Sequence, residues 1–336
     1  MSISYQILGR AGWDNGLYVR INGGTKVHRL LFDCGENILK DLSHREVNSI
    51  DYLFLSHLHI DHIAGFDYFF RRTYDREKKA VFVFGPEDTI DIIHNRMQGF
   101  KWNLVKGIPG EWYINEFTEK KLTSCLYKTS DGFSEKYKVK KKSFDGLLIN
   151  NSDFTVRVTL LDHIIPSAAY FVKEKPSLNI NIDELTKAGW KPGSWLETVK
   201  DLSVNPAEEI ELDGKAYKLK YLRDKLLEKN EGESIGYLTD FIYNTLSAAK
   251  IKKVFKGCDT MICESQYHPS EQKFAKKNYH LTSTQAARLA KAANVKKLIL
   301  FHISDRYRTR NFPALIKEAR KIFPETYLPD EWKIKN

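Results

Sequence analysis

The most constraining feature of this chain is the segment Ser56-His57-Leu58-His59-Ile60-Asp61-His62, which directly follows the apolar run 50–55. That run predicts a buried strand. Because residues i and i+2 of an extended chain point the same way, His57 and His59 can converge on one ion. Asp61 and His62 lie where the chain turns into a helix and can serve a second ion. A lone histidine is usually a core or surface residue, but this density of imidazole and carboxylate groups indicates a site for zinc or a similar divalent metal.

Three more candidate ligands, His163, Asp240 and His302, each follow a segment with the pattern of a strand. In open α/β sheets, functional groups gather beyond the carboxyl ends of strands. We therefore expect these residues to join the same site. Taken singly, Asp240 could instead cap a helix, and either histidine could be a buried polar residue.

Short apolar runs alternate with helical patterns along the chain, which predicts the α/β class. The predicted helices are residues 88–97 and 283–293. The predicted strands are residues 5–8, 17–21, 29–32, 50–55, 80–84, 154–161, 234–238, 260–263 and 297–301.

Two segments depart from this alternation. Residues 112–150 are polar and predict a hairpin in which Lys136, Lys138, Lys140 and Lys142 share one face of a strand. These lysines could protect a solvated sheet edge or contact phosphates. Residues 173–233 mix proline, glycine, asparagine and charged residues, and predict an insertion within a domain that spans residues 1–336.

The composition limits the kinds of partner and the cellular location that can be expected for this chain. The 336 residues carry a net charge of +10, which favours polyanionic partners only weakly. The four cysteines show no paired spacing, so buried thiols in a reducing compartment are expected. We also see no basic leader with an apolar core, and no apolar run of the ~20 residues that a spanning helix needs. The sequence thus predicts a soluble cytoplasmic protein with no membrane contact.

The seven-residue motif resembles that of the metallo-β-lactamase superfamily, and the wider pattern is similar to the ribonuclease Z family of transfer-RNA 3′-processing endonucleases. The similarity extends over nearly the whole chain. Its other motifs are Phe32-Asp33-Cys34-Gly35-Glu36, Phe84-Gly85-Pro86, His163-Ile164-Ile165-Pro166-Ser167 with Tyr170, Cys263-Glu264-Ser265, His280-Leu281-Thr282 and Phe301-His302-Ile303-Ser304-Asp305-Arg306-Tyr307.

The resemblance implies a four-layer αβ/βα sandwich with two metal ions at one edge. It assigns His57, His59 and His163 to one ion, and Asp61, His62 and His302 to the other, with Asp240 as the bridge. Zinc is expected, with manganese or iron as alternatives. The family's homodimers are expected by analogy.

The resemblance also assigns residues 173–233 to a protruding arm that grips transfer RNA. Residues 185–196, LTKAGWKPGSWL, look like the glycine- and proline-containing part of that arm. Residues 171–235 hold slightly more acidic than basic residues, so any RNA contact there must be local, through Lys187, Lys191 and the glycine backbone. An ordinary insertion that covers a dimer interface is the alternative.

Phosphodiester hydrolysis needs an activated water, neutralised phosphoryl oxygens and a protonated leaving oxygen, and two divalent ions can provide the first two. Asp61 is placed both to bind metal and to accept the water's proton. His280 is the candidate general acid, with Glu264 as the carboxylate that orients it, and the resemblance gives this pair the same role. Alternatively, His280 could be a capping or surface histidine and Glu264 a surface acid.

The expected function is the removal of 3′ trailers from precursor transfer RNA. The N-terminal loop, Gly9-Arg10-Ala11-Gly12-Trp13-Asp14-Asn15, departs from the family pattern, which puts discrimination of the trailer in doubt. Thr239-Asp240-Phe241 also replaces the family's Gly-Asp-Thr. The alternatives are a hydrolase of a lactone, thioester, sulfate or small phosphodiester on the same scaffold, and an RNA-binding module whose metal site is idle.

Overall fold

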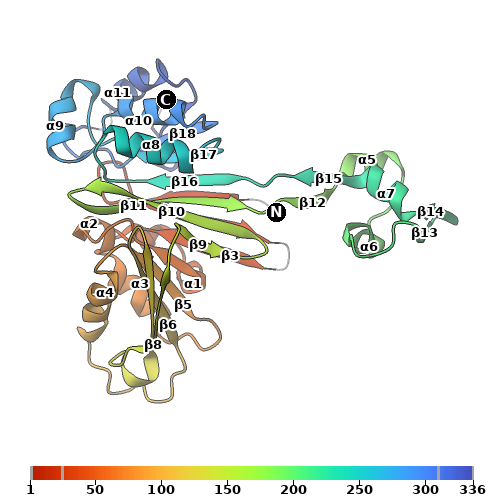
Figure 1. The fold of residues 1–336 in the computed structure, drawn as a ribbon, viewed down its shortest axis with the longest axis horizontal. Coiled ribbons are helices and arrows are strands. Elements are labelled where there is room, and N and C mark those ends of the chain that lie inside the picture. Colours follow the sequence, from red (N-terminus) through yellow and green to blue (C-terminus); the bar gives the residue numbers. More distant parts are fainter. Residues whose placement is uncertain (1–2, 24–25, 309–310, 335–336) are drawn as a thin grey trace. The chain divides into compact units, whose positions relative to one another are not determined.

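The computed structural model describes residues 3–23, 26–308 and 311–334. The chain divides into two compact units, a smaller one of residues 174–232 and a larger one made of the residues on either side (Figure 1). Within the described ranges, no helix has the length and apolar character needed to cross a bilayer.

The first sheet of the larger unit has eight strands in sequence order. Its central strands are parallel, whereas both ends of the sheet are antiparallel. The strands are β1 (Ile3–Leu8), β2 (Gly16–Asn22), β3 (Val27–Phe32), β4 (Tyr52–Phe54), β5 (Val81–Gly85), β6 (Glu111–Phe117), β7 (Lys121–Lys128) and β8 (Tyr137–Ser143). The helices of this half are α1 (His44–Ser49), α2 (Ile60–Ile63), α3 (Phe66–Thr73) and α4 (Thr89–Gln98).

The second sheet has seven strands in the order β19-β18-β17-β16-β11-β10-β9. These are β9 (Leu147–Asn150), β10 (Phe154–His163), β11 (Ile165–Glu174), β16 (Ser234–Leu238), β17 (Thr260–Glu264), β18 (Lys297–Phe301) and β19 (Thr326–Tyr327). The helices of this half are α8 (Thr245–Val254), α9 (Gln272–Lys277), α10 (Ser283–Ala292) and α11 (Phe312–Arg320).

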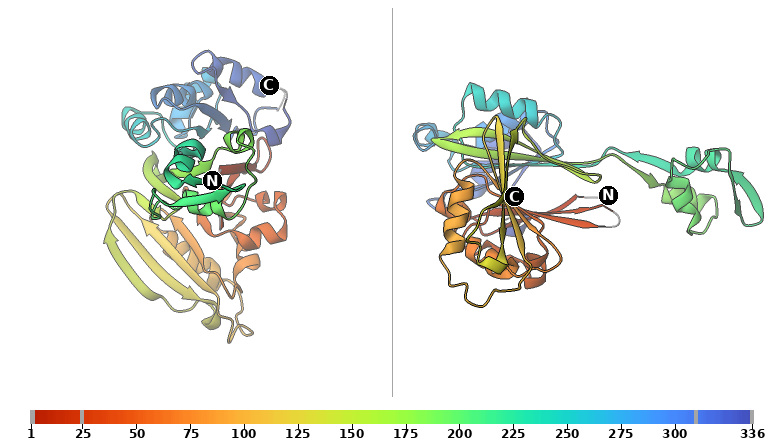
Figure 2. Two further views of the ribbon diagram at one scale, coloured as in Figure 1. Left: turned by 90° about the vertical axis from the view of Figure 1, so that its right-hand side faces the viewer. Right: turned by 60° about the horizontal axis from the view of Figure 1, so that its bottom comes forward.

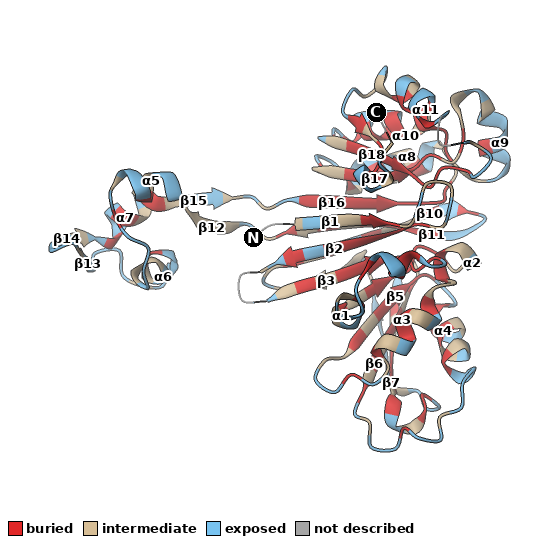
Figure 3. Ribbon diagram, turned by 180° about the vertical axis from the view of Figure 1, so that it is seen from behind, coloured by how far each residue is buried: buried red, intermediate tan, exposed pale blue. Residues whose placement is uncertain are grey.

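Three hydrophobic cores hold these layers together (Figure 3). One lies between the first sheet and its helices, and another lies between the second sheet and α8, α10 and α11. The third fills the space between the sheets, where Phe54 stacks on Phe32 and on Phe84 with ring centroids 4.9 and 5.2 Å apart. The expected four-layer αβ/βα sandwich is therefore confirmed.

Local sequence signals explain where several helices begin. Ser43 and Glu46 form a reciprocal capping box at the start of α1, and Thr282 and Gln285 form another at the start of α10. The predicted helix 283–293 and strands 234–238 and 297–301 agree closely with α10, β16 and β18. The strand predicted at residues 50–55 is shorter, because Ile50 ends α1 and only Tyr52–Phe54 pair as β4.

The prediction that four alternating lysines share one face was wrong. Ser124 pairs with Lys140 but Leu126 pairs with Tyr137, so β8 contains one extra residue between these pairs. The extra residue is a β-bulge in which Lys138 has a φ of 46°. Lys140 and Lys142 therefore share a face, but the face does not continue through the bulge to Lys136.

The smaller unit has its own small core. Leu185, Trp190, Val199, Leu219 and Leu222 are buried together in it. Its strands form two antiparallel pairs, β12 (Ser177–Ile180) with β15 (Leu227–Asn230), and β13 (Glu209–Leu212) with β14 (Lys215–Lys218). Its helices are α5 (Ile182–Lys187), α6 (Trp195–Lys200) and α7 (Leu219–Leu226) (Figure 2).

Hydrogen bonds from β11 tie the two sheets together behind the metal motif. The buried Tyr170 hydroxyl donates to the carbonyl of Leu55 at 2.6 Å, and the amide of Ala168 donates to the carbonyl of Ser56 at 2.7 Å. Both acceptors lie just after β4, so the second sheet fixes the chain that leads to His57.

We expect Tyr170→Phe to lower the free energy of unfolding by about 1–2 kcal/mol, because the buried Leu55 carbonyl loses its donor. Tyr127→Phe is the matched control, since the buried Tyr127 hydroxyl has no partner among the described residues. Urea denaturation of both variants measures the difference. Equal stability of the two variants would show that the Tyr170 hydrogen bond contributes nothing.

Candidate metal centre

The structure gathers all seven candidate ligands at one edge of the sandwich. They come from the segment after β4, the first turn of α2, the end of β10, and the residues after β16 and β18. The three strands of the second sheet run in the same direction, so their carboxyl ends meet at that edge. The ligand atoms form two groups, each within 4.8 Å: His57, His59 and His163, and Asp61, His62, Asp240 and His302.

Asp240 lies between the two groups. Its Oδ2 is 3.7 Å from His57 Nε2 and 3.8 Å from His163 Nε2 of the first group. The same oxygen is 3.2 Å from His62 Nε2, and Oδ1 is 3.0 Å from His302 Nε2, both in the second group. One carboxylate thus faces imidazoles of both groups, which is the arrangement that a bridging ligand requires.

Hydrogen bonds on the outer side fix which nitrogens face the cluster. His163 Nδ1 lies 2.9 Å from the carbonyl of Tyr279 and donates to it, so Nε2 is the nitrogen that faces the cluster. His62 Nδ1 lies 2.8 Å from Asp33 Oδ2, which likewise turns its Nε2 inward. Partners of this kind orient metal-binding histidines.

Asp33 belongs to the motif at residues 32–36, which was given no role from the sequence, and it is a fully buried residue of this site. Its carboxylate accepts hydrogen bonds from the Ser56 amide and hydroxyl and from the Tyr237 hydroxyl, in addition to contacting His62. One carboxylate therefore fixes the start of the metal motif and a strand of the opposite sheet. The signal that could have identified it is an aspartate directly after the predicted strand 29–32.

Burial and neighbouring charges shift the pKa values of several candidate ligands. Burial lowers the pKa of His57 well below its usual value, and the neighbouring His62 lowers it further, so His57 is neutral and able to bind a metal. Burial would raise the pKa of Asp240, but His302 and His62 outweigh it and keep the carboxylate ionised. Likewise, burial would raise the pKa of Asp61, and the hydrogen bond from His62 lowers it instead.

The backbone is strained around these groups. Asp33, Ile164, Asp240 and His302 all have φ between 49° and 65°, although none is a glycine. A β-branched residue such as Ile164 is rarely found in this region. Strain of about 1–3 kcal/mol per residue persists only where the surrounding structure imposes it, and such residues cluster at functional sites.

His280 and Glu264 lie beside the cluster. His280 Nδ1 is 3.1 Å from Glu264 Oε2, and the His280 ring centroid is 4.9 Å from that of His163. Burial would lower the pKa of His280, but Glu264 and Asp240 raise it to about 9. The fully buried Glu264 also accepts hydrogen bonds from the amides of Phe241 and Leu281, so it connects the Asp240 segment to the His280 segment.

Known proteins resemble this chain in sequence and in fold. Ribonuclease Z from Deinococcus radiodurans is 33% identical over 330 residues, which cover 98% of each chain. Ribonuclease Z from Methanocaldococcus jannaschii is 32% identical over 88% of this chain and 83% of its own. A protein-family model described as anti-Pycsar protein Apyc1 matches residues 21–101.

Two solved structures match nearly the whole fold. The metallo-β-lactamase fold protein YhfI from Bacillus subtilis superimposes with a TM-score of 0.58 at 16% identity, covering 98% of this chain and 96% of its own. Human tRNase Z, short form, gives a TM-score of 0.54 at 19% identity with the same coverage. These likenesses establish the metallo-β-lactamase fold, and the full-length identity to the Deinococcus protein shows that the chain belongs to the ribonuclease Z family.

Proposed function

We propose that this chain is a metal-dependent endoribonuclease that removes 3′ trailers from precursor transfer RNA. Membership of the ribonuclease Z family supports this function. The observation that carries the proposal is the position of the His280–Glu264 pair, 3.1 Å apart, directly beside two groups of candidate metal ligands. An assay that compares cleavage of precursor transfer RNA carrying a 3′ trailer with hydrolysis of bis-p-nitrophenyl phosphate and of a thioester tests this proposal. Hydrolysis of the small substrates alone would favour a small-molecule hydrolase.

We infer that the two groups hold two divalent ions, one on His57, His59 and His163 and the other on Asp61, His62 and His302, with Asp240 shared. The donor set fits such ions, because imidazoles of both groups surround a buried carboxylate that is held in its ionised form. Divalent ions supply Lewis acidity, which activates water and offsets the charge of phosphoryl oxygens. The identity of the metal as zinc stays a prediction. The assembly of the chain into a homodimer also stays a prediction.

The chain's own residues would move the protons. Asp61 is partly exposed and ionised, so its carboxylate can accept a proton from an attacking water. Because Glu264 occupies Nδ1 of His280, Nε2 is the nitrogen left to donate a proton to the leaving 3′-oxygen. The carboxylate of Glu264 stabilises the imidazolium form that this donation needs.

We propose that residues 174–232 act as the RNA-gripping arm. Gly189 has a φ of 74° and open space around it, so its backbone is available for a close approach. Lys191 has no ion-pair partner among the described residues, whereas Lys187 is bound to Glu184 at 2.7 Å. Of the two lysines, Lys191 therefore offers its charge to RNA more freely.

Asp240→Ala should lower the metal content below that of the wild-type chain, because among the described residues Asp240 is the carboxylate within 4 Å of imidazoles in both groups. Elemental analysis after dialysis measures the bound metal, and Asp67→Ala, which removes an exposed carboxylate from α3, serves as the control. A chelator should abolish cleavage, and added zinc or manganese should restore it. Unchanged metal content in Asp240→Ala would contradict the bridging role.

His280→Ala should reduce turnover on RNA by ~10²-fold or more, because the leaving oxygen loses its proton donor. Its metal content should stay at the wild-type level. That measurement matters because His280 also lies within 4.8 Å of His163 and Asp240 through ligand atoms and could instead bind a metal. His268→Ala is the matched control outside the cluster; loss of metal together with activity would refute the acid assignment.

Replacing residues 178–229 with a short glycine loop should weaken binding of precursor transfer RNA and leave hydrolysis of bis-p-nitrophenyl phosphate nearly unchanged. The replacement is sterically simple, because Ser177 and Asn230 are paired neighbours on β12 and β15. Comparison of KM and kcat on the two substrates measures the effect. An equal loss on both substrates would show that the arm maintains the fold instead of binding RNA.

A further inference from the structure

Strand β8 carries a basic stripe that no part of the proposed mechanism uses. The stripe consists of Lys138, Lys140, Lys141 and Lys142, all exposed on the edge strand of the first sheet; Lys140 and Lys142 share one face of the strand, and Lys141 lies on the other. Within the described part of the chain, none of the four has a carboxylate within ion-pair distance, whereas neighbouring Lys136 is bound to Asp91 at 2.8 Å. Four positive charges therefore face solvent without compensation.

Protection of the sheet edge does not account for this many charges. Lysines and bulges both hinder pairing with another strand, and β8 already has the bulge at Lys138. Adjacent like charges repel one another, so the stripe costs stability unless a polyanion binds it. The stripe is therefore better suited to contacts with successive phosphates.

Because of the direction in which β8 runs, one end of the stripe lies at the edge of the sandwich where the candidate metal ligands gather. β8 runs parallel to β6, and β6 runs parallel to β5 and β4, so the carboxyl end of β8 lies at the same edge as the segment containing His57. Four strand spacings separate β4 from β8, which is roughly 19 Å at about 4.8 Å per strand. Lys142 is therefore within reach of an RNA strand that emerges from the cluster.

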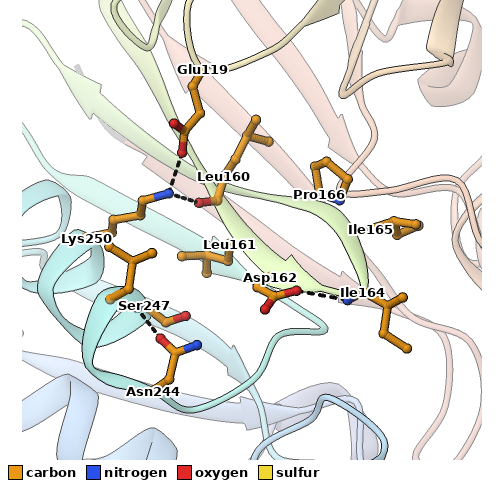
Figure 4. Close-up of a pocket in the computed structure, with 11 residues that line it drawn as sticks. Glu119, Leu160, Leu161, Asp162, Ile164, Ile165, Pro166, Asn244, Ser247 and Lys250 are labelled. Atoms are coloured by element: carbon orange, nitrogen blue, oxygen red, sulfur yellow. Dashed lines mark hydrogen bonds and ion pairs between the residues drawn. The ribbon is translucent and has the colours of Figure 1, made fainter.

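Two neighbouring cavities, together called the groove below, lie between the two places. Next to His163, a cavity of about 330 Å³ is lined by Ile164, Ile165, Pro166, Leu160 and Lys250 (Figure 4). Its wall contains an ion pair, because Lys250 Nζ binds Glu119 and also the carbonyl of Leu160 at 2.9 Å.

A second cavity of about 330 Å³ shares Glu119, Leu160 and Lys250 with the first. It extends to Phe144 and Asp145, directly after β8, and its rim includes the exposed Arg157 and Lys253. The two cavities are therefore neighbours, one beginning at the residue after His163 and the other reaching the residues that follow the stripe.

The lining of this groove suits a single RNA strand. Sites for single strands combine cations along the backbone path with apolar or aromatic faces for the bases. The groove offers Ile165, Pro166 and Phe144 as apolar faces, and Arg157 and Lys253 as cations with no carboxylate in ion-pair distance among the described residues. Its lining also includes the carboxylates of Asp145 and Asp162.

We propose that the single-stranded 3′ trailer of the precursor leaves the metal cluster along this groove and is held by the basic stripe. This inference rests on the proposed function, because it assigns the groove to the part of the substrate beyond the cut. The structure thereby gives the enzyme a second RNA contact within its larger unit.

The test compares two precursors that differ only in trailer length. One trailer has about 12 nucleotides, within the roughly 4–16 that a single-strand site occupies, and the other has about 2. The triple variant K140Q/K141Q/K142Q should raise KM about tenfold for the long trailer and leave the short one unchanged. The affinity of the wild type for the long trailer should fall with salt concentration. In the triple variant, the magnitude of the slope of log affinity against log salt concentration should be smaller by about 2, because each of the three lost phosphate contacts contributes ~0.7.

Two further variants serve as controls. K78Q/K101Q/K106Q removes three exposed lysines near the opposite edge of the same sheet, before β5 and β6, and should behave as wild type. K140R/K141R/K142R keeps the charge and should also behave as wild type. Gel filtration of all three variants shows whether any loss of charge causes aggregation.

The possible outcomes separate the two proposals. No dependence on trailer length in the wild type, or an equal effect of the glutamine variant on both precursors, would overturn the trailer site and leave the proposed function intact. Failure of the wild type to cut either precursor would overturn the proposed function and the trailer assignment with it. A selective loss on the long trailer, absent from both control variants, would establish the site.

Discussion

The buried carboxylate of Asp240 is the constraint on which the site depends. This side chain is about 3% exposed, and an isolated buried charge is far too costly to keep unless groups of opposite charge surround it. The imidazoles that surround it come from both sheets: His57 and His62 from the first, His163 and His302 from the second. The site therefore forms only when the two sheets pack against each other.

Asp33 extends this coupling into the core. Through Ser56, His62 and Tyr237 it fixes both halves of the sandwich with a single carboxylate, and Tyr170 adds a hydrogen bond from β11 to the carbonyl of Leu55. The left-handed backbone at Asp33 shows that the fold accepts local strain to place that carboxylate. Rigid support of this kind holds ligand groups close together even though like-charged imidazoles repel.

Sequence patterns predicted the parts of the structure that depend on local preferences. The buried strands Ser234–Leu238 and Lys297–Phe301 and the capped helix α10 follow from short apolar runs and capping residues, and the strand ends show which side chains share an edge. The bulge at Lys138 was not predictable, because cross-strand register decides it and lysines fit either face. The role of Asp33 was missed for a similar reason, since its partners lie up to 204 residues away in the chain.

The distribution of charge indicates where RNA binding must originate. Residues 171–235 carry slightly more acidic than basic side chains, so the surplus behind the net charge of +10 lies in the larger unit. Binding of nucleic acid draws much of its affinity from phosphate contacts, and an arm without net positive charge contributes to it mainly through local geometry. The exposed lysines of β8, a strand whose carboxyl end lies at the edge of the candidate metal ligands, therefore place part of this long-range attraction on the same sheet as the candidate site.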